Sequence, residues 1–541
     1  MLWGHNYNRN REHKDMSTKV STMIGTRNIV RGAVIVAVGL TMTSCFGGKK
    51  SGHSGDKSSA TGWAYNDPTY GGFEYQSGYE QETGPGLVFI EGGTFVMGRV
   101  EQDVLYSHNS TPRRATVTSF YMDECEVSNA NYREWLYWIN HVFEENKAVY
   151  IDALPDTLVW RRPLAYNEPY VQNYLRHPAY ADYPVVGVNW EQANKYCNWR
   201  TDRVNENILY EKGIIELNVN EQKEENNFNT EAYLYGQQAV NPGPKELDDL
   251  ANEGQKRRVR WDDGILLPDY RLPSEAEWEF AALGLIGNTY DERMSDRKIY
   301  PWNSHVVRNP DDRDRGRMMA NFVRGNGDYM GTAGYLNDKG DITVDVHSYW
   351  PNDYGLYCMA GNVNEWVRDV YRPMTFEDAS ELNPFRGNVF DQLVVDETGA
   401  PVEKDSIGRL RRHVETSEEI GDRKNYRDAY QINYLDGDDN SNINVSQTWD
   451  GKTYNSSAMY GGMPTFDGES DRYNEIGKQL GSLISDKTRV YKGGGWRDRA
   501  YWLSPGTRRF LDQKECRDDI GFRCAMVRVG APEQGGKSQK L

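Results

Sequence analysis

Three consecutive glycines followed by a tryptophan constrain this chain more than any other feature. Residues 490–503 read VYKGGGWRDRAYWL, and GFRC follows at residues 521–524. Glycine has no Cβ and tolerates positive φ, so residues 493–495 allow the backbone to pass close to another segment. A tight crossing in the core is the simplest interpretation. The alternative is that the polar residues after the tryptophan carry out chemistry, so any activity of this chain should be decided here.

The composition fits a folded, loop-rich body. The chain has 541 residues, among them 15 Trp, 36 Tyr, 15 Phe and 52 Gly. That aromatic content is far too high for a disordered chain, and the glycines indicate many turns and crossings. We therefore expect an irregular α+β fold, built as about two or three average domains or as one large domain with insertions.

The charge argues against nucleic acid as a partner. The formal net charge is −17, whereas binding to phosphates requires a basic surface. The basic run KRRVR at residues 256–260 lies between acidic stretches and is expected to be a solvated face. The nine His form neither an HExxH motif nor a paired-His spacing, and no Cys-x-x-Cys occurs, so the sequence does not indicate zinc.

The N-terminal residues predict a secreted lipoprotein. An apolar run at residues 32–40 follows two arginines and is closed by Met-Thr-Ser-Cys45, which is typical of a secretory signal with a lipid-attachment cysteine. About ten apolar residues are too few to span a bilayer. We assign residues 1–44 to the signal peptide, with translation starting at Met23, and Cys45 to lipidation. The alternative is an N-terminal segment whose cysteine is there by chance.

The residues after Cys45 predict a tether and an extracytoplasmic body. Residues 45–62 are rich in Gly, Ser and Lys, as flexible linkers are. If Cys45 carries lipid, the body lies outside the cytoplasm, where disulfides can form. We expect a single domain at 63–528 and a polar tail at 529–541. Five further cysteines leave at least one unpaired thiol: Cys125, Cys197, Cys358, Cys516 and Cys524.

Several elements can be predicted in the first part of the body. Residues 86–98 read as two short strands joined at a Gly-Gly pair, and residues 116–122 as a further strand. Ser128 has the position of an N-cap ahead of an amphipathic helix, and Asn189 caps a second helix. Residues 143–180 show mixed composition and are expected to form loops.

Two long insertions interrupt this pattern. Residues 203–264 are polar and acidic and are expected to carry about one helix, while residues 371–487 show neither heptads nor a clear repeat. We expect the second insertion to be a partly ordered surface excursion suited to partner contacts. Between the insertions, Ser274 and Glu277 form the pattern of a capping box, which gives that carboxylate a structural role.

Two segments rich in Gly, Asn and Asp could surround a hard cation. One occupies residues 300–329, and the other reads YGLYCMAGNVNEW at residues 354–366. Their side-chain and main-chain oxygens are the ligands that calcium prefers. Turns whose polar groups are already satisfied are an equally good interpretation of both segments.

A series of motifs resembles one known family. The motifs are, in order, GLVFIEGGTFVMG, FYMDECEVSNANYREW, YPVVGVNWEQANKYCNW, RLPSEAEWEFAA, YPWN, YGLYCMAGNVNEW, VYKGGGW and GFRC. With them the chain, from about Pro85 to Arg528, resembles the formylglycine-generating-enzyme family, also called the sulfatase-modifying-factor domain. The resemblance implies one compact domain related to the C-type-lectin fold, with little regular secondary structure and with the two insertions.

The resemblance also implies that a copper site has been lost. Enzymes of that family oxidise a cysteine of a sulfatase with oxygen, using copper held by two cysteines that fall four and nine residues after the second glycine of the GGS[WY] motif. Counting from Gly494 places Asp498 and Leu503 there. Neither a carboxylate nor a hydrocarbon replaces a thiolate pair on Cu(I), so we expect no copper and no catalysis. The alternative is another enzyme in the same cleft, using Asp498 with Arg497 and Arg499, although an aspartate between two arginines is more often a salt-bridged strand end.

A disulfide and two calcium sites are further implications of the resemblance. Cys524 of GFRC is similar to a family cysteine that is bridged to the Cys of the YCxW motif, which is Cys197 here. At the second calcium site Cys358 replaces a customary Asn, which removes one oxygen ligand. The implied calcium ligands are Asn321, the Phe322 carbonyl and nearby Asp328 at the first site, and Gly361, Val363 and Glu365 at the second.

Within the family, the lipoprotein signal, the lost cysteines and the long insertions are most similar to gliding-motility lipoproteins of the Bacteroidetes, the GldJ type and its relative GldK. TGWAYNDPTYGGF, LRHPAYADYPVVGV and YGLYCMAGNVNEWVRDVYRP are closest to the GldJ type. This implies a non-catalytic scaffold at the periplasmic face of the outer membrane, in the type IX secretion and gliding machinery, with a GldK-type lipoprotein among its partners. A module that binds glycan or peptidoglycan is a third hypothesis, suggested by the lectin-like fold alone.

Overall fold

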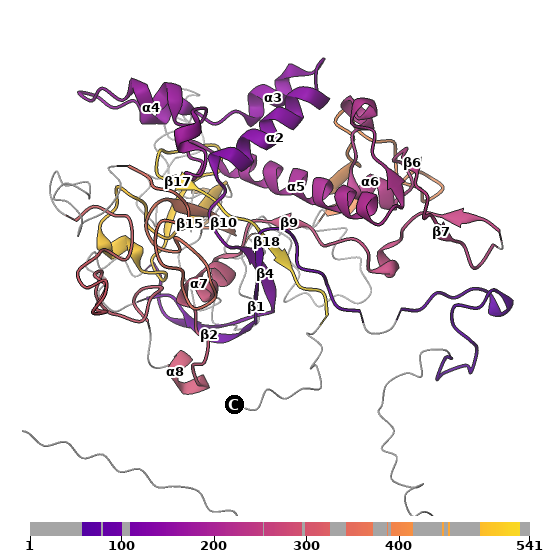
Figure 1. Cartoon of the computed structure of the whole chain (residues 1–541), viewed down its shortest axis with the longest axis horizontal. Helices are drawn as coiled ribbons and strands as arrows, with labels where there is room; N and C mark the ends of the chain where they lie inside the picture. Colours follow the sequence, from indigo (N-terminus) through magenta and orange to yellow (C-terminus); the bar gives the residue numbers. More distant parts are fainter. Residues whose placement is uncertain are drawn as a thin grey trace, which may run out of the picture. The chain divides into compact units, whose positions relative to one another are not determined.

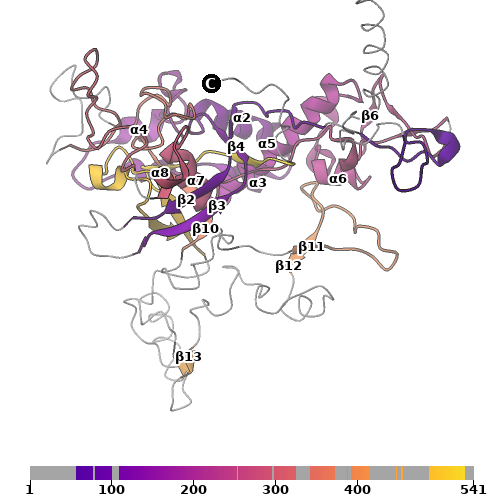
Figure 2. The same cartoon turned by 90° about the horizontal axis from the view of Figure 1, so that it is seen from below.

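The computed structural model divides the chain into two compact units, Met1–Ser77 and Gly78–Leu541 (Figures 1 and 2). The predicted signal peptide, Cys45 and most of the second insertion lie outside the described residues. The structure describes residues 57–76, 79–99, 109–252, 254–294, 298–324, 342–371, 387, 391–414, 446–447, 453–454 and 487–530.

The described part of the first unit is a short loop closed on itself. It contains one turn of 3₁₀ helix, η1 (Pro68–Tyr70). Asn66 and Tyr75 join its two ends, because Asn66 Nδ2 donates to the Tyr75 carbonyl at 3.0 Å and the Tyr75 amide donates to Asn66 Oδ1 at 2.9 Å. Trp63 and Phe73 are exposed on this loop.

A four-stranded antiparallel sheet joins the two ends of the second unit. Its strand order is β1-β4-β18-β9 (Figure 1). Ala525 lies opposite both Met122 and Arg271, so the C-terminal strand is an inner strand of a sheet that begins near the N-terminus. The strands are β1 (Leu87–Ile90), β4 (Phe120–Asp123), β18 (Ala525–Val527) and β9 (Tyr270–Arg271).

A second four-stranded sheet carries the glycine-rich motif. Its order is β16-β15-β10-β17, and β10 pairs antiparallel with β15 but parallel with β17. The three glycines follow the end of β15, and GFRC begins in β17, so both motifs flank β10. The strands are β16 (Arg509–Asp512), β15 (Thr488–Lys492), β10 (Asn364–Val370) and β17 (Ile520–Gly521).

The remaining strands form pairs, and one of them corrects a prediction. The two strands predicted in residues 86–98 are confirmed as β1 and β2 (Gly93–Met97). The single strand predicted at 116–122 is wrong, because β3 (Arg113–Val117) pairs with β2 whereas β4 belongs to the first sheet. A Cβ on Gly92 would lie 2.3 Å from the Val117 carbonyl oxygen, so the chain crosses itself where the strand breaks. The other pairs are β5 (Ile215–Glu216) with β6 (Asn241–Pro242), β7 (Leu247–Asp248) with β8 (Lys256–Arg257), β11 (Asp391–Leu393) with β12 (Arg412–Val414), and β13 (Ser446–Gln447) with β14 (Thr453–Tyr454).

Both predicted helix caps are confirmed. The Ser128 side chain accepts a backbone N–H of the first turn of α2 (Asn129–Val142). Asn189 does the same for α5 (Trp190–Glu211) and forms a full capping box there. Helix α5 continues into the predicted insertion at 203–264, so this insertion begins inside a regular element.

The capping box predicted ahead of the third main helix is also confirmed. The Ser274 side chain accepts from the Glu277 amide, and the Glu277 carboxylate returns to the Ser274 amide, at the start of α7 (Glu275–Leu283). Arg271 donates to both oxygens of Glu277 at 2.7 Å. Burial acts to raise the pKa of Glu277, but the charge and hydrogen bonds of Arg271 hold it below its usual value. The carboxylate therefore has a structural role.

Residues 143–180 contain short helices, which corrects the prediction of loops. The segment holds α3 (Lys147–Ala153), η2 (Thr157–Trp160), α4 (Glu168–Asn173) and η3 (Pro178–Tyr180). Each is too short to show a stripe of apolar residues, and α3 buries only one residue, so periodicity could not reveal them. The remaining helical elements are η4 (Val219–Glu221), η5 (Glu224–Asn226), α6 (Thr230–Leu234), η6 (Trp261–Asp263), α8 (Tyr290–Met294) and η10 (Ala500–Leu503).

The main apolar core lies between helices α2 and α5 and the strands (Figures 1 and 2). Tyr132 of α2 stacks on Tyr196 of α5 with ring centroids 5.9 Å apart, and Phe522 meets Tyr196 edge-on at 5.4 Å. A second cluster packs α7 against β2 and β3. The fold is α+β and rich in loops, as predicted. Within the described ranges, no helix has the length and apolar character needed to cross a membrane.

Candidate functional site

The three glycines form a tight turn directly after β15. Gly493 and Gly494 have φ values of +99° and +70°. Residues with a Cβ adopt such values only with backbone strain. A Cβ on Gly494 would lie 2.9 Å from the Trp502 carbonyl, and one on Gly495 would lie 2.9 Å from Asn364 Nδ2. The predicted close crossing is therefore confirmed, and it sets the path of the loop that follows.

Asp498, at the first of the two positions where the family would hold copper, forms a buried ion pair with Arg509. The guanidinium donates to the two carboxylate oxygens at 2.8 and 2.6 Å, and these side chains are only 11% and 15% exposed. The Gly495 amide and Asn364 Nδ2 also donate to Asp498, at 2.8 and 3.1 Å. Burial acts to raise the pKa of Asp498, but the charge and hydrogen bonds of Arg509 outweigh it and hold that pKa below its usual value. Asp498 is therefore an ionised structural group.

The salt bridge expected for Asp498 is confirmed, and its partner lies outside the glycine-rich motif. The flanking Arg497 contacts Asp518 instead, which Arg162 also contacts. The partner in the structure is Arg509, on the neighbouring strand β16. No spacing rule marks Arg509, because the contact depends on how the loop folds back over the sheet.

Leu503, at the second position, is part of an apolar cluster. Its side chain is completely buried at the end of η10. A leucine provides no metal ligand, and its surroundings are hydrocarbon as well. The buried residues packed with it are Met318, Ala320, Phe322 and Ala360.

A third carboxylate near this loop, Asp519, belongs to no pattern that sequence reasoning could have singled out. It is fully buried, Asn364 Nδ2 and Arg517 Nη2 each donate to its Oδ2 at 3.3 Å, and its Oδ1 has no hydrogen-bond partner. Burial and the charges of Asp498 and Asp518 raise the pKa of Asp519 to about 6, against the opposing charge of Arg517. In the described part of the chain, the side chains that contact these three carboxylates are arginines and Asn364, so none supplies a nucleophile or a neutral base.

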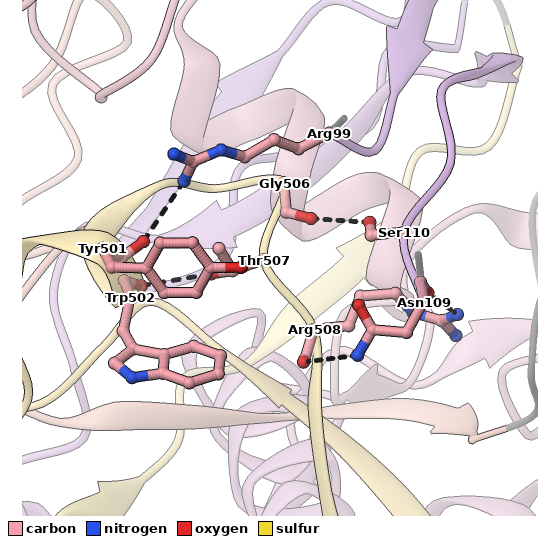
Figure 3. A pocket seen from close by; sticks show the side chains of 8 residues that line it. All are labelled: Arg99, Asn109, Ser110, Tyr501, Trp502, Gly506, Thr507 and Arg508. Carbon is pink, nitrogen blue, oxygen red and sulfur yellow. Dashed lines mark hydrogen bonds between the residues drawn. The ribbon is translucent and has the colours of Figure 1, made fainter. Parts of the chain in front are cut away.

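A small polar pocket lies beside the same loop (Figure 3). Its polar groups bond to backbone carbonyls: Ser110 Oγ donates to Gly506 at 2.6 Å, and Arg99 donates to Tyr501 at 3.2 Å. These bonds tie residues between β2 and β3 to η10 and the loop that follows it, so the pocket is a packing seam between two segments. Its lining residues are Arg99, Asn109, Ser110, Tyr501, Trp502, Gly506, Thr507 and Arg508.

The cysteines predicted to form a disulfide lie next to each other. Cys197 of α5 and Cys524 beside β18 are both buried, and their Sγ atoms are 3.5 Å apart. A disulfide bond measures about 2.05 Å, so the two sulfur atoms lie side by side at more than bonding distance. Burial raises the pKa of Cys524 well above its usual value. The disulfide itself stays a prediction.

Glu365, predicted at the second calcium site, is bound by other side chains. Arg523 donates to each of its oxygens at 2.6 Å, and Trp278 Nε1 donates to it at 2.7 Å. Gly361, with φ +81°, and Val363 lie in the turn that leads to this carboxylate. A guanidinium in direct contact repels a metal ion, so the groups present here do not favour calcium.

Glu126 is a second buried carboxylate beside this turn that the sequence did not single out. It accepts hydrogen bonds from Asn362 Nδ2 at 2.6 Å and from the Val363 amide at 3.2 Å. Burial and the negative charge of Glu365 raise the pKa of Glu126 well above its usual value. Cys358, at the position of the missing Asn ligand, donates its thiol to the Val346 carbonyl at 3.5 Å. These groups brace the turn against neighbouring segments.

The first calcium site is only partly described. Asn321 is fully buried and donates to the Ile342 carbonyl at 2.8 Å, while its Oδ1 has no hydrogen-bond partner. An orphaned amide oxygen fits a cation ligand, and the buried Phe322 follows it, but Asp328 lies outside the described residues. This site stays a prediction. Among the residues that the structure describes, no group of three or more His, Cys, Asp or Glu side chains could hold a metal ion.

Comparison with known proteins decides the family. The family described as "Sulfatase-modifying factor enzyme 1-like domain" matches residues 73–528. The chain belongs to this family. The match runs through both predicted insertions and includes the glycine turn, both cysteines of the close pair and the two positions occupied by Asp498 and Leu503.

Relatives within the sulfatase-modifying-factor family carry different names. Formylglycine-generating enzyme of Mus musculus is 25% identical over 287 residues, which cover 52% of this chain and 58% of that protein, so the chain spans less than two thirds of its length. Formylglycine-generating enzyme of Thermomonospora curvata is 24% identical, and the match covers 53% of this chain and 73% of that protein. Inactive C-alpha-formylglycine-generating enzyme 2 of Mus musculus is 23% identical, and the match covers 55% of this chain and 72% of that protein. Among solved structures, PvdO from Pseudomonas aeruginosa matches with a TM-score of 0.36 and 14% identity, over 82% of this chain and 94% of that one. Since relatives named as enzymes and as inactive both occur, membership alone does not decide activity.

Proposed function

We propose that this chain is a non-catalytic member of the sulfatase-modifying-factor family that serves as a scaffold lipoprotein in the type IX secretion and gliding machinery. The observation that supports the non-catalytic part is which residues stand at the two positions where the family is implied to hold copper. Asp498 is neutralised by Arg509 inside the protein, and Leu503 is packed in hydrocarbon. A Cu(I) site needs soft sulfur ligands, and the residues present do not fit it.

The alternative, an oxidase in the same cleft, can be tested directly on the purified chain. We expect no Cu(I) binding at this loop and no oxygen consumption in the presence of a cysteine-containing peptide. The matched variant Asp498→Cys/Leu503→Cys restores two thiols at the same positions and shows whether the assay responds to them. Copper-dependent oxygen consumption by the unaltered chain would overturn the non-catalytic assignment.

The location rests on the sequence. The signal at residues 1–44, the lipidation motif at Cys45 and the tether at 45–62 support an outer-membrane lipoprotein that faces the periplasm. The segments closest to the GldJ type support the assignment to the gliding and secretion machinery, with a GldK-type lipoprotein as a partner. Calcium at Asn321 is a further part of this proposal.

Deletion of the gene in the native host tests the assignment. We expect the deletion to reduce type IX secretion and to lower the level of the GldK-type lipoprotein. The unaltered gene and Cys516→Ser, which changes a half-exposed thiol, should restore both, whereas Cys45→Ser should not. Unchanged secretion together with an unchanged level of the GldK-type lipoprotein in the deletion strain would show that the assignment is wrong.

A further inference from the structure

Two arginines share the carboxylate of Asp518, beside the glycine-rich loop. Arg162 Nη2 donates to its Oδ2, and Arg497 Nη1 donates to its Oδ1. The Asp518 side chain is only 2% exposed, whereas the two arginine side chains are 26% and 31% exposed. The carboxylate therefore lies deeper than the two guanidinium groups, which meet at it from the solvent side.

This sharing leaves an excess of positive charge among the described groups of the loop. Asp498 pairs with Arg509. Arg517 donates to Asp519. Each of these two aspartates has an arginine of its own, whereas Asp518 is contacted by two. Because one guanidinium can pair with a carboxylate through two parallel hydrogen bonds, the fold requires only one arginine here. The second places a like charge close to the first, and the two repel each other unless a further anion is present.

Both guanidinium groups also keep unused hydrogen-bond donors. A guanidinium carries five N–H donors and no acceptor. Within the described part of the chain, the side-chain hydrogen bonds of both arginines go to Asp518 alone, through one nitrogen each. The remaining nitrogens are Nε and Nη1 of Arg162 and Nε and Nη2 of Arg497. None of these four belongs to the buried groups that lack a partner, so they reach solvent.

The two arginines are held in place by the surrounding structure. The Arg162 guanidinium lies 5.3 Å from the centre of the Trp496 ring. That ring is buried and stacks on Trp160 with centroids 6.0 Å apart, and its Nε1 donates to the Asp518 carbonyl at 3.0 Å. Arg497 directly follows Trp496 after the glycine turn. Side chains that are already ordered lose less conformational entropy when a ligand binds.

We propose that Arg162 and Arg497 form an anion-binding site for a phosphate group, beside the two positions where the family is implied to hold copper. The site combines an excess positive charge, four unused nitrogens and a fixed geometry. Asp518 sets the spacing of the two guanidinium groups from behind. This inference goes beyond the proposed scaffold function and does not depend on it.

The chemistry of the donors favours phosphate over other anions. A phosphate group has three or four oxygens around one phosphorus, so it can accept hydrogen bonds from both planar guanidinium groups at once. A carboxylate has only two oxygens and a single charge, so it engages fewer of the four nitrogens. The formal net charge of −17 opposes nucleic acid as the source of the phosphate. The ligand is therefore free phosphate or a small phosphate monoester.

Calorimetric titration of the purified full-length chain with inorganic phosphate, at constant ionic strength in chloride buffer, tests the site. We expect saturable binding with a Kd below about 1 mM. Arg162→Gln and Arg497→Gln should each weaken binding about tenfold or more, because hydrogen bonds to charged groups are strong. Arg162→Lys keeps the charge but loses the planar fork, so it should weaken binding as well. Unfolding midpoints measured in parallel show that each variant is folded.

The matched control is Arg315→Gln. Arg315 is 72% exposed and pairs with Asp312, so its loss should leave phosphate binding unchanged. The proposal fails if the unaltered chain shows no saturable phosphate binding, or if the folded variants at Arg162 and Arg497 bind phosphate as tightly as the unaltered chain. An equal loss in Arg315→Gln would also overturn it, because the effect would then come from the general charge of the surface.

Glycerol 3-phosphate and acetate separate the classes of ligand in the same titration. Tighter binding of inorganic phosphate would support the free anion as the ligand, and tighter binding of glycerol 3-phosphate would support a monoester. Acetate should bind at least tenfold more weakly than either. If acetate bound as tightly as inorganic phosphate, the site would be a carboxylate site, and the assignment to phosphate would be wrong.

Discussion

The resemblance to the family implies sulfur pairs at two places in this fold, and the residues present at the two places differ. At the glycine-rich loop stand Asp498, which is neutralised by Arg509, and Leu503 in an apolar cluster. Between α5 and the strand β18, Cys197 and Cys524 are buried and 3.5 Å apart. The first place therefore holds an ion pair and hydrocarbon, whereas the second holds two neighbouring sulfurs.

The glycine turn keeps its close backbone contacts with no thiol at either of the two positions. Gly494 still approaches the Trp502 carbonyl closely enough to exclude a Cβ, and Trp496 still donates to the Asp518 carbonyl at 3.0 Å. The turn therefore shapes the loop whether or not thiols follow it. If this is right, the residues that replace the thiols should stabilise the fold, and their removal should be costly.

The largest effect is expected from Asp498→Ala. Removal of this carboxylate leaves Arg509 charged and nearly buried without its partner, which costs about 3–5 kcal/mol of unfolding free energy. The pKa of Asp498 is lowered in the folded state, so its contribution is fully present above the ordinary aspartate pKa of about 3.9 and is lost as the pH falls through the lower folded value. Urea unfolding at pH 7 and at about pH 3 measures both effects.

Asp312→Ala is the matched control for that experiment. Asp312 also pairs with an arginine, Arg315, but both side chains are largely exposed, at 89% and 72%. Exposed ion pairs contribute little to stability, so we expect no measurable loss of unfolding free energy in Asp312→Ala. Equal losses for Asp498→Ala and Asp312→Ala would mean that the replacement at the glycine-rich loop does not stabilise the fold, and the contrast between the two regions would disappear.

The second largest effect is expected at the retained thiols. Oxidation should link Cys197 to Cys524, which are 327 residues apart, and raise the unfolding free energy by about 2–4 kcal/mol. Unfolding with and without dithiothreitol, combined with mass spectrometry of alkylated protein, measures the bond and its effect. Cys197→Ser should abolish the difference, and Cys516→Ser should leave it intact. Full alkylation of both cysteines in the unfolded, non-reduced protein would show that they are a dithiol.

The features that sequence could predict are those set by neighbouring residues. The caps at Ser128, Asn189 and Ser274 are confirmed because each requires only a side chain and the next turn of backbone. The glycine crossing follows from the missing Cβ atoms. The break between β3 and β4 could not be predicted, because it depends on which sheet each half joins, and that choice is made by distant strands.

The candidate site shows the same limit more clearly. The motif count placed Asp498 and Leu503, but it could not show that Asp498 pairs with Arg509 rather than with its neighbours, since that contact requires β16 to lie beside the loop. Asp519 stood out in no pattern, because its raised pKa arises from burial and from carboxylates that the fold brings near it. Glu126 is a similar case, beside the turn that leads into β10.

A third, smaller effect should come from Asp519→Asn. The folded pKa of Asp519 is raised from 3.8 to about 6, so its favourable contribution is fully present below the unfolded value and is lost as the pH rises through about 6. The shift corresponds to at most about 3 kcal/mol. We therefore expect Asp519→Asn to flatten the decline in unfolding free energy between pH 4 and pH 7, and to be neutral or stabilising at pH 8.

The control for that experiment is Asp312→Asn, which changes an exposed carboxylate and should leave the pH profile as it is. If Asp519→Asn keeps the same decline between pH 4 and pH 7, another group causes it. If it lowers the unfolding free energy at pH 8, the ionised carboxylate is needed beside Arg517. The loop would then depend on three charged aspartates rather than on one ion pair.

The smallest effect is expected from Arg497→Gln, and it separates the pairing of Asp498 with Arg509 from a pairing with the flanking arginine. Arg497 is 31% exposed and contacts Asp518, which Arg162 also contacts, so its loss should cost less than about 1 kcal/mol. Arg509→Gln is the matched change, because it leaves Asp498 ionised and buried without a cation and should cost several times more. Urea unfolding of both variants at pH 7 measures the difference. If the two variants lost equal amounts of unfolding free energy, both arginines would stabilise Asp498. The loop would then hold a shared charge network instead of a single ion pair.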